Sequence, residues 1–325
     1  HLSHELIQLG YQVTIICEQS ESDHDPSIRV IVLPVSAQRR RWKAMRDFNN
    51  RLDQLFENCP ELLTSIIHSH ERTAWHQVTT FHGPPIKKTD GIPWYKKFSQ
   101  RLHYWLDVEY RELCSVRVQR VIPVSKMIGD QLCALYPESQ SRMMRPGYPA
   151  LRDSSPKRFR QCGGNWKLLF VGKEWKRKGL PKAVEICDIL AEKNAIQLDV
   201  FGVSESDVTQ DLRRDFVNFH GYHSSIPFDQ HDLIIHPAIS EPFGMAVIEA
   251  LANGCRALVS NRVGASEINH KGLIVKSIDA SSSEWVDSAL NLLSEVPGQL
   301  TKFETWADLA MYHHGSIYKD ISVLD

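Results

Sequence analysis

The sequence predicts an α/β protein of two Rossmann-like domains, each a doubly wound parallel sheet, facing a central cleft. Its 325 residues suffice for about two domains of ordinary size. Short β-branched runs alternate with amphipathic stretches along the whole chain. Most of these runs are apolar throughout, which is typical of a parallel sheet covered on both faces. A polar stretch near the middle interrupts the alternation and divides the chain into two halves.

The first domain is expected over residues 1–153. Its opening segment HLSHELIQLG has the pattern of a helix that ends at Gly10. Apolar, β-branched runs then predict strands, because such residues fit the pleated surface of a sheet. These strands are expected at residues 11–17, 28–33, 64–68, 77–81 and 119–125.

Residues 154–165 (SSPKRFRQCGGN) form a predicted linker, because they are polar, contain proline and glycine, and lack apolar periodicity. The second domain is expected over residues 166–303. Its strands are predicted at residues 167–172, 196–202, 216–220, 232–237, 256–260 and 272–275, and helices at about 180–193, 243–253, 283–294 and 302–321. We expect the end of the chain, residues 304–325, to return to the first domain as a helix.

Charge and cysteine content narrow the class of protein. The formal net charge of −1 argues against a surface that coats nucleic acid, so we expect no nucleic-acid partner. No apolar run approaches the length of a membrane span. The seven cysteines include no CxxC pair, which favours free thiols in a reducing compartment and hence a cytoplasmic protein.

The segment HPAISEPFGMAVIEALANGCRALVS (236–260) carries the clearest indication of a site. A strand is expected to end at its start, a loop then carries Glu241, and a helix begins near Phe243. Backbone N–H groups of Phe243, Gly244 and Met245 at the start of this helix favour an anion, and the glycine allows a ligand to come close.

Glu249 stands two turns into this otherwise apolar helix. A buried carboxylate needs hydrogen-bond donors, and the diol of a ribose supplies two. The alternative interpretation is that Glu249 is simply a solvated helix residue.

The pattern EPFGMAVIE, two glutamates separated by seven residues, resembles that of the family 4 retaining glycosyltransferases, which have the GT-B fold. Further segments resemble that family in the same order and cover nearly the whole chain. They are TTFHGPP (79–85), VIPVSKMIGDQL (121–132), RPGYP (145–149), GNWKLLFVGKEWKRKGLPKAVEI (164–186), FHGYH (219–223) and ETWADLAMYHHGSIYKDI (304–321). The loop before Lys178 and the HPA triplet resemble the lipopolysaccharide core enzymes of this family.

The resemblance implies roles for individual residues. Glu241 and His82 would contact the donor sugar, and Glu249 the ribose. Lys178, with Arg177 or Lys173 as second cation, would neutralise the diphosphate leaving group, which makes Glu241, His82 and Lys178 the predicted catalytic residues. The predicted donor-binding residues are Lys173, Arg177, Lys178, Phe243, Gly244, Met245, Glu249 and Tyr222.

The resemblance implies a retaining, metal-independent glycosyltransferase without a cofactor, which uses a nucleotide-sugar, in the first place a UDP-sugar, as co-substrate. The acceptor would be a hydroxyl of a saccharide or lipid-linked saccharide, in lipopolysaccharide or other cell-envelope synthesis. Alternatives are a nucleotide-sugar epimerase of the same fold and a non-catalytic, membrane-associated saccharide-binding protein. The family's first strand and Gly-rich loop are expected before His1 and are absent from this sequence.

A stretch rich in aromatic and basic residues, 91–114, suits a helix at an anionic lipid surface. The lipopolysaccharide core enzymes carry a comparable insertion, and this resemblance implies that the helix faces the inner side of the cytoplasmic membrane. The stretch has five aromatic residues within 94–105, where the 9% composition predicts about one. A second basic cluster, QRRRWKAMR, lies at 38–46. The predicted membrane-surface residues are Trp94, Tyr95, Lys96, Lys97, Phe98, Arg101 and Trp105. The alternative is a core helix with aromatic packing.

Two further patterns indicate metal chemistry only weakly. Asp23-His24-Asp25 matches a D-x-D signature but lies in a polar loop. His68-Ser69-His70, near Glu71 and His76, lacks the later ligand that would complete a zinc site. We therefore predict no metal site.

Overall fold

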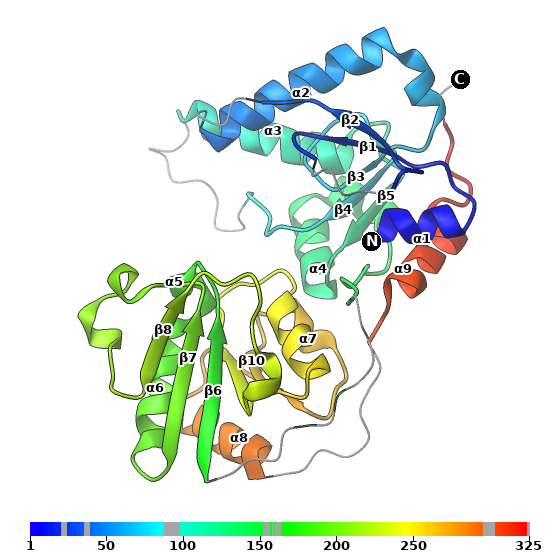
Figure 1. Ribbon diagram of the computed structural model, residues 1–325. Coiled ribbons are helices and arrows are strands. Elements are labelled where there is room, and N and C mark those ends of the chain that lie inside the picture. The colour runs from blue at the N-terminus through cyan, green and yellow to red at the C-terminus, as the bar shows by residue number, and fades with distance from the viewer. Residues whose placement is uncertain are drawn as a thin grey trace. The chain divides into compact units, whose positions relative to one another are not determined.

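The computed structural model describes residues 1–20, 25–35, 40–87, 98–151, 157, 159, 164–294 and 303–323. The chain divides into two compact units (Figure 1): residues 1–152 with 305–325, and residues 153–304. All the strand pairings among the described residues are parallel. The predicted α/β class with parallel sheets is therefore confirmed.

The second unit contains a six-stranded sheet in the order β11-β10-β9-β6-β7-β8. Its strands are β6 (Asn165–Val171), β7 (Ala195–Phe201), β8 (Val217–Gly221), β9 (Leu233–His236), β10 (Arg256–Ser260) and β11 (Leu273–Lys276). Successive strands extend the sheet from β6 to β8, after which the chain returns to β9 on the other side of β6. The border between β6 and β9 is thus the topological switch point, where doubly wound sheets bind ligands beyond their strand ends.

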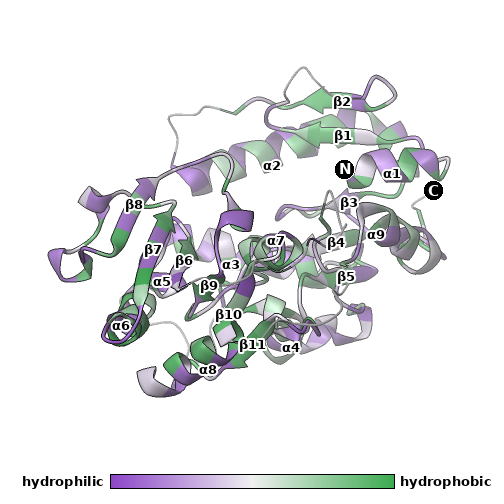
Figure 2. Ribbon diagram, turned by 60° about the horizontal axis from the view of Figure 1, so that its bottom comes forward, coloured by the Kyte–Doolittle hydropathy of each residue, from purple (hydrophilic) through white to green (hydrophobic). Residues whose placement is uncertain are grey.

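Three helices of the second unit pack on this sheet through apolar faces: α6 (Leu180–Ala191), α7 (Met245–Ala252) and α8 (Ser282–Ser294). The short helix α5 (Trp175–Lys178) precedes α6 and has no fully buried residue. Buried residues of α6 and α8, among them Leu180 and Trp285, share one core with alternate residues of the strands, such as Leu168 and Leu198. Helix α7 contacts β9 and β10. Figure 2 shows hydrophobic and hydrophilic residues alternating along α8, as expected for a helix with one buried side.

The first unit has two parallel sheets among its described residues. One pairs β1 (Thr14–Cys17) with β2 (Arg29–Val32), and the other has the order β3-β4-β5. The strands of the second sheet are β3 (His68–Ser69), β4 (Val78–Phe81) and β5 (Arg120–Pro123). Because the strands are parallel, the residues that follow β3 and β4 emerge at the same edge of the sheet.

The helices of the first unit are α1 (Leu2–Gln8), α2 (Arg41–Asn58), α3 (Gln100–Cys114), α4 (Lys126–Leu135) and α9 (Trp306–Tyr312). A π-helical turn, His313–Ile317, follows α9. Helices α1 and α9, from opposite ends of the chain, lie side by side (Figure 1). None of the helices in the described ranges combines the length and apolar character that a membrane-spanning helix needs.

Short 3₁₀ helices connect several elements of both units. They are η1 (Pro60–Thr64), η3 (Pro137–Arg142), η4 (Glu205–Asp207), η5 (Gln210–Leu212), η6 (Phe228–Gln230) and η7 (Gly264–Glu267).

Most predicted elements are somewhat shorter in the structure, and for two of them the local reason is evident. Residues 64–68 do not form one strand, because Pro60 starts η1 and the backbone N–H of Ile67 donates to the Gln77 side chain at 2.8 Å. The final helix begins at Trp306 because Thr305 and Asp308 form a capping box just before it. In both places a side-chain hydrogen bond, invisible to hydrophobic periodicity, sets the boundary.

Candidate active site

Two loops beside the switch point bring Lys178 and Glu241 together. Lys178 ends α5, which follows β6, and Glu241 lies in the loop that follows β9. The Nζ atom of Lys178 and the Nη1 atom of Arg177 each lie 3.3 Å from Oε2 of Glu241. The Glu241 side chain is 12% exposed. A partly buried carboxylate therefore faces two cations at the position where this fold class binds ligands.

The backbone around Lys178 is adapted to this arrangement. A Cβ atom on Gly172 would lie 2.2 Å from Cδ of Lys178, so the lysine side chain runs directly over a glycine at the end of β6. Gly179 has φ of +83°, and a Cβ there would lie 2.0 Å from the carbonyl oxygen of Pro237. Only glycine therefore lets α5 approach the loop after β9 this closely.

The backbone of Glu241 is held by the loop that follows β10. Its N–H donates to the Arg262 carbonyl, and its carbonyl accepts from the N–H of Gly264, both at 3.0 Å. The Ser260 hydroxyl donates to the carbonyl of Ala238 at 2.5 Å. Loops after three neighbouring strands, β6, β9 and β10, thus fix the position of this one carboxylate.

Electrostatics keep Glu241 ionised. Burial by itself would raise the pKa of its carboxyl group, but the nearby His236 ring and the positive charges of Lys178 and Arg177 outweigh burial and lower the pKa to about 2. A carboxylate that stays charged and acceptor-only suits the recognition of hydroxyl groups.

Two other basic residues of this loop differ in the number of ion pairs and hydrogen bonds that they form. Arg177 also bonds Glu174, with Nη2 to Oε2 at 2.6 Å, and the Ser240 carbonyl. Lys173 is exposed and forms no ion pair with the described residues. The structure therefore brings Arg177 and Lys178 together on Glu241, whereas Lys173 extends from the same loop into solvent.

Helix α7 begins at Met245, two residues later than predicted, because Gly244 is its N-cap with φ of +99°. Phe243 is buried and its carbonyl accepts from Ala265 N–H at 2.7 Å. Met245 is 37% exposed.

Glu249 is half-buried within the apolar helix α7. Its carboxylate makes no hydrogen bond or ion pair with any residue that the structure describes, and burial raises its pKa. Glu249 is thus more buried than a solvated helix residue, and its charge has no protein partner in the described chain.

A second group of loops lies at the neighbouring edge of the same sheet. Gly172 N–H donates to the Phe201 carbonyl at 2.9 Å, and Gly202 N–H to the Gly221 carbonyl at 2.6 Å. Tyr222, which follows β8, is 87% exposed. The Lys173 loop is therefore connected through two glycines to the Tyr222 loop, and sequence reasoning missed the roles of Gly172 and Gly202.

In the first unit, His82 follows β4 and contacts a second histidine. Its Nε2 lies 2.9 Å from Nδ1 of His70, which follows β3. The rings of His70 and His68 stack with centroids 4.5 Å apart, and His68 stacks on His313 at 5.3 Å. Sequence analysis considered His68 and His70 only for a metal site and missed this pair, although the parallel order of β3 and β4 brings both ends to one edge.

Buried carboxylates of α3 anchor the loop after His82. Glu109 accepts hydrogen bonds from the N–H groups of Ile86 at 2.6 Å and Lys87 at 3.0 Å, and Arg72 Nη2 lies 3.3 Å from it. Burial raises the pKa of the neighbouring Glu112 to about 8. Residues 82–87 are therefore held at His82 by His70 and at Ile86 and Lys87 by Glu109.

The predicted membrane surface is described only in part. Trp94, Tyr95, Lys96 and Lys97 lie outside the described residues. Phe98 is 85% exposed and Arg101 is exposed, whereas Trp105 is half-buried with Cζ of Arg72 5.9 Å from its ring centroid. The helix thus has an exposed start and a packed second turn.

The second basic cluster lies close to the first. Trp42 of α2 packs against Tyr104 of α3 with ring centroids 6.2 Å apart. Lys43 and Arg46, both exposed, lie within 5.6 Å and 5.3 Å of the Trp42 ring centroid. Helices α2 and α3 therefore meet through Trp42 and Tyr104, and the exposed Lys43 and Arg46 lie beside this contact.

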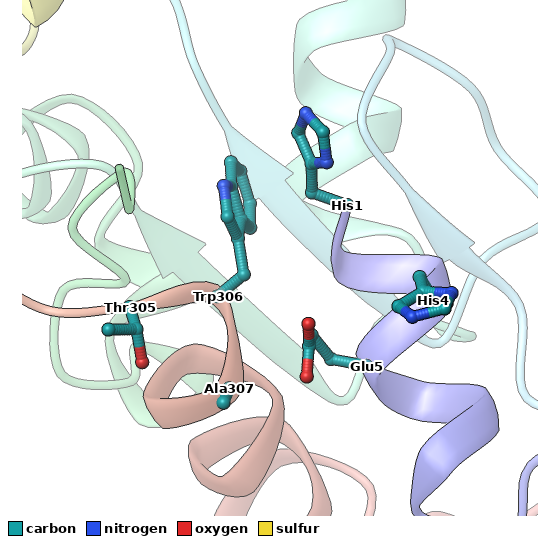
Figure 3. Close-up of a pocket in the computed structure, with 6 residues that line it drawn as sticks. All are labelled: His1, His4, Glu5, Thr305, Trp306 and Ala307. Atoms are coloured by element: carbon teal, nitrogen blue, oxygen red, sulfur yellow. The ribbon is translucent and has the colours of Figure 1, made fainter. Parts of the chain in front are cut away.

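A pocket of about 460 Å³ lies where α1 meets α9 (Figure 3). It is lined by His1, His4, Glu5, Thr305, Trp306 and Ala307. In Figure 3 the Trp306 indole lies next to His1, and their ring centroids are 5.6 Å apart. The pocket shares no residue with the predicted site.

The patterns considered for metal binding do not form a ligand cluster in the described part of the chain. Asp23 and His24 lie outside that part, and Asp25 bonds the Ser27 hydroxyl at 2.5 Å. His76 Nδ1 bonds the Thr73 hydroxyl at 2.9 Å.

Two family models match the sequence in succession. "Glycosyltransferase Family 4" matches residues 1–148, and "Glycosyl transferases group 1" matches residues 152–297. Together they cover nearly the whole chain. The chain therefore belongs to the family 4, group 1 glycosyltransferases with the GT-B fold, as the sequence pattern predicts.

Relatives and solved structures agree with this fold. An uncharacterised glycosyltransferase of Methanocaldococcus jannaschii is 25% identical over 240 residues, which cover 66% of this chain and 60% of that relative, so the chain spans less than two thirds of its length. The crystal structure of WaaG, a glycosyltransferase involved in lipopolysaccharide biosynthesis, superposes with a TM-score of 0.72 at 15% identity over 98% of this chain and 90% of WaaG. Anabaena HepE, in complex with UDP and glucose, superposes with a TM-score of 0.65 at 14% identity over 98% and 95%. At these identities the likeness concerns the fold alone.

Proposed function

We propose that this protein is a retaining glycosyltransferase that moves a sugar from a nucleotide-sugar to a hydroxyl group of a saccharide or lipid-linked acceptor. The observation that carries the proposal is the contact of Lys178 and Arg177 with Glu241 at the switch point of the second unit's sheet, in a chain that belongs to a glycosyltransferase family. Two cations that could bind a diphosphate thus lie next to a carboxylate that could bind sugar hydroxyl groups. The second unit would bind the donor and the first unit the acceptor.

The donor diphosphate is the proposed ligand of Lys178, Arg177 and Lys173. Charge-assisted hydrogen bonds from such groups contribute about 1.5–3 kcal/mol each and strengthen as negative charge develops on the leaving phosphate. Lys173 extends freely into solvent and can reach a ligand without breaking an ion pair with the described residues. With these cations in place the reaction needs no metal ion.

The nucleoside would lie on the loops beside the phosphates. Glu249 has a half-buried carboxylate without a partner in the described chain, and the two hydroxyl groups of a ribose are donors that would satisfy it. Tyr222 offers an exposed ring next to the Lys173 loop for the base. A UDP-sugar is the proposed donor, and HepE, which shares the fold, binds UDP and glucose.

Glu241 would bind hydroxyl groups of the donor sugar, and His82 would contact the sugar near its anomeric carbon. In the proposed front-face step, the bond from the anomeric carbon to the diphosphate oxygen breaks while the acceptor oxygen bonds the same carbon from the same side. The acceptor's proton passes to the leaving phosphate. Configuration is retained, and no protein nucleophile is required.

The acceptor is proposed to be a lipopolysaccharide or other cell-envelope saccharide, reached from the inner face of the cytoplasmic membrane. The exposed Phe98 and Arg101 and the basic residues Lys43 and Arg46 of α2 support this, because aromatic and cationic side chains together suit an anionic lipid surface. WaaG, named for lipopolysaccharide biosynthesis, shares the fold.

A screen of UDP-, GDP- and ADP-sugars against lipid-linked and lipopolysaccharide acceptors, read by mass spectrometry and anomeric proton NMR, tests the proposal. We expect a new glycoside with the donor's anomeric configuration. An inverted product would contradict retention, a new sugar-nucleotide without acceptor would indicate an epimerase, and the absence of any nucleotide binding would indicate a saccharide-binding protein.

A further inference from the structure

His236, the last residue of β9, is a buried histidine whose ring makes no hydrogen bond within the described part of the chain. Its side chain is 1% exposed, and neither Nδ1 nor Nε2 has a hydrogen-bond partner in the described chain. The polar group that Nε2 faces is Oε2 of Glu241, 3.9 Å away. That separation exceeds hydrogen-bond range by about 1 Å.

An imidazole in this state is costly for the fold. A buried polar group without a partner loses hydration and gains nothing in return, which destabilises a protein by about 1–3 kcal/mol. Burial also lowers the pKa of His236, so that the ring is neutral and carries one N–H donor. A hydrogen bond from this donor to the Glu241 carboxylate would remove that cost.

The ion pairs of Glu241 indicate when this hydrogen bond would form. Lys178 Nζ and Arg177 Nη1 each lie 3.3 Å from Oε2 of Glu241. The proposed diphosphate ligand needs the same two cations. When they turn to the phosphates, Glu241 loses its charged partners while it remains shielded from water.

We propose that His236 is a positioning residue for Glu241, which donates its Nε2–H to that carboxylate once the donor diphosphate draws Lys178 and Arg177 away. The exchange requires a movement of about 1 Å and keeps Glu241 ionised and aligned toward the donor sugar. His236 itself touches neither sugar nor phosphate in this role. The inference rests on the proposed function, because it needs a diphosphate at Lys178.

Substitution of His236 tests the inference. His236→Leu removes both nitrogens at similar volume, and His236→Gln keeps an N–H donor. We expect His236→Leu to bind UDP within about threefold of the wild type, by calorimetry, and to lose about tenfold or more in kcat, as for one lost charge-assisted hydrogen bond. His236→Gln should recover most of that loss. Thermal unfolding of both variants shows that they are folded.

Three results would overturn the inference. They are an unchanged kcat in His236→Leu, an equal defect in His236→Gln, and a parallel loss of UDP affinity, which would indicate a structural role. Failure of the proposed function looks different, because the wild type itself would then neither bind UDP nor transfer a sugar.

A spectroscopic readout does not depend on turnover. In ¹⁵N-histidine-labelled wild-type protein, saturation with UDP should shift the Nε2–H resonance of His236 downfield and slow its exchange with water. The same titration of a Lys178→Ala variant should produce a smaller change. If the protein binds UDP but the His236 resonance does not change, the proposed hydrogen bond from His236 to Glu241 does not form.

Discussion

Lys178 and Glu241, from loops after β6 and β9, form an ion pair with Nζ and Oε2 3.3 Å apart at the switch point of the second unit's sheet. The group proposed to face phosphate and the group proposed to face sugar therefore hold each other in place. Such preorganised charges cost little reorganisation when a reaction begins.

Gly172 should be essential for the reach of Lys178. In Gly172→Ala the new methyl group would lie 2.2 Å from Cδ of Lys178 and displace that side chain. We expect kcat/KM to fall by at least about tenfold, the value of one weakened charge-assisted hydrogen bond. Gly164→Ala is the matched control, because nothing lies within 4 Å of its added Cβ. Equal activity of the two variants would contradict the account.

The two glutamates of the E-x7-E pattern should respond oppositely to pH. Burial raises the pKa of Glu249, so its contribution to stability is present below the unfolded pKa of 4.5 and is lost as pH rises through the folded value. Glu249→Gln should therefore unfold at a higher temperature than the wild type at pH 8, with the difference disappearing toward pH 4.5. The same variant should bind UDP at least about fivefold more weakly, because the ribose loses an ionic acceptor.

Glu241→Gln provides the contrast. The pKa of Glu241 is lowered to about 2, so its stabilising contribution is present above pH 4.5 and is lost as pH falls toward 2. This variant should be less stable than the wild type at neutral pH. Shifts of the same sign in both variants, followed by thermal unfolding across pH, would refute the electrostatic description.

His70 should affect catalysis through His82. The 2.9 Å contact between their ring nitrogens fixes the tautomer and orientation of His82. His70→Phe preserves an aromatic ring for stacking but removes the hydrogen bond, which is worth about 0.5–1.5 kcal/mol, so kcat should fall about two- to tenfold with an unchanged affinity for UDP. His103→Ala, at an exposed position of α3, is the control in assays without membranes. A changed UDP affinity would indicate a different role.

The basic surface of α2 and α3 should bind anionic vesicles. Reversing Arg46 and Arg101 to glutamate together should weaken co-sedimentation with phosphatidylglycerol vesicles by at least about 30-fold at low salt, from about 1 kcal/mol per basic residue. Reversing Lys193 and Lys271, exposed residues of the second unit, should have little effect. If the wild-type protein does not co-sediment with such vesicles at either low or high salt, these residues do not form a membrane-binding surface.

Hydrophobic periodicity predicted most strands of the second unit, and the charged residues that follow those strands predicted the position of the site. The strand runs are long and apolar, and Lys178 and Glu241 each follow one of them, so their residue types indicated a site before the sheet order was known. The order itself, with β6 beside β9, comes from long-range packing that a single sequence does not display.

Contacts between distant residues were harder to predict. The bond between His70 and His82 depends on β3, a two-residue strand whose hydrophobic pattern is too short to locate. His236 was recognised as a strand end, but its burial and its 3.9 Å approach to Glu241 follow from the packing of three loops. Trp105 is an aromatic residue of the type expected at a membrane surface. Its contact with Arg72 shows that its ring instead packs against the first unit.

Calorimetric titration of UDP into wild-type, Lys178→Ala and Lys176→Ala proteins tests the central claim most directly. Lys176 lies in the same short helix and is exposed, and its side chain lies over the Trp175 ring, with Nζ 5.0 Å from the ring centroid. The account predicts that Lys178→Ala weakens UDP binding by about tenfold or more, whereas Lys176→Ala binds within about twofold of the wild type. Equal affinity of all three proteins for UDP would contradict the placement of the donor diphosphate at Lys178.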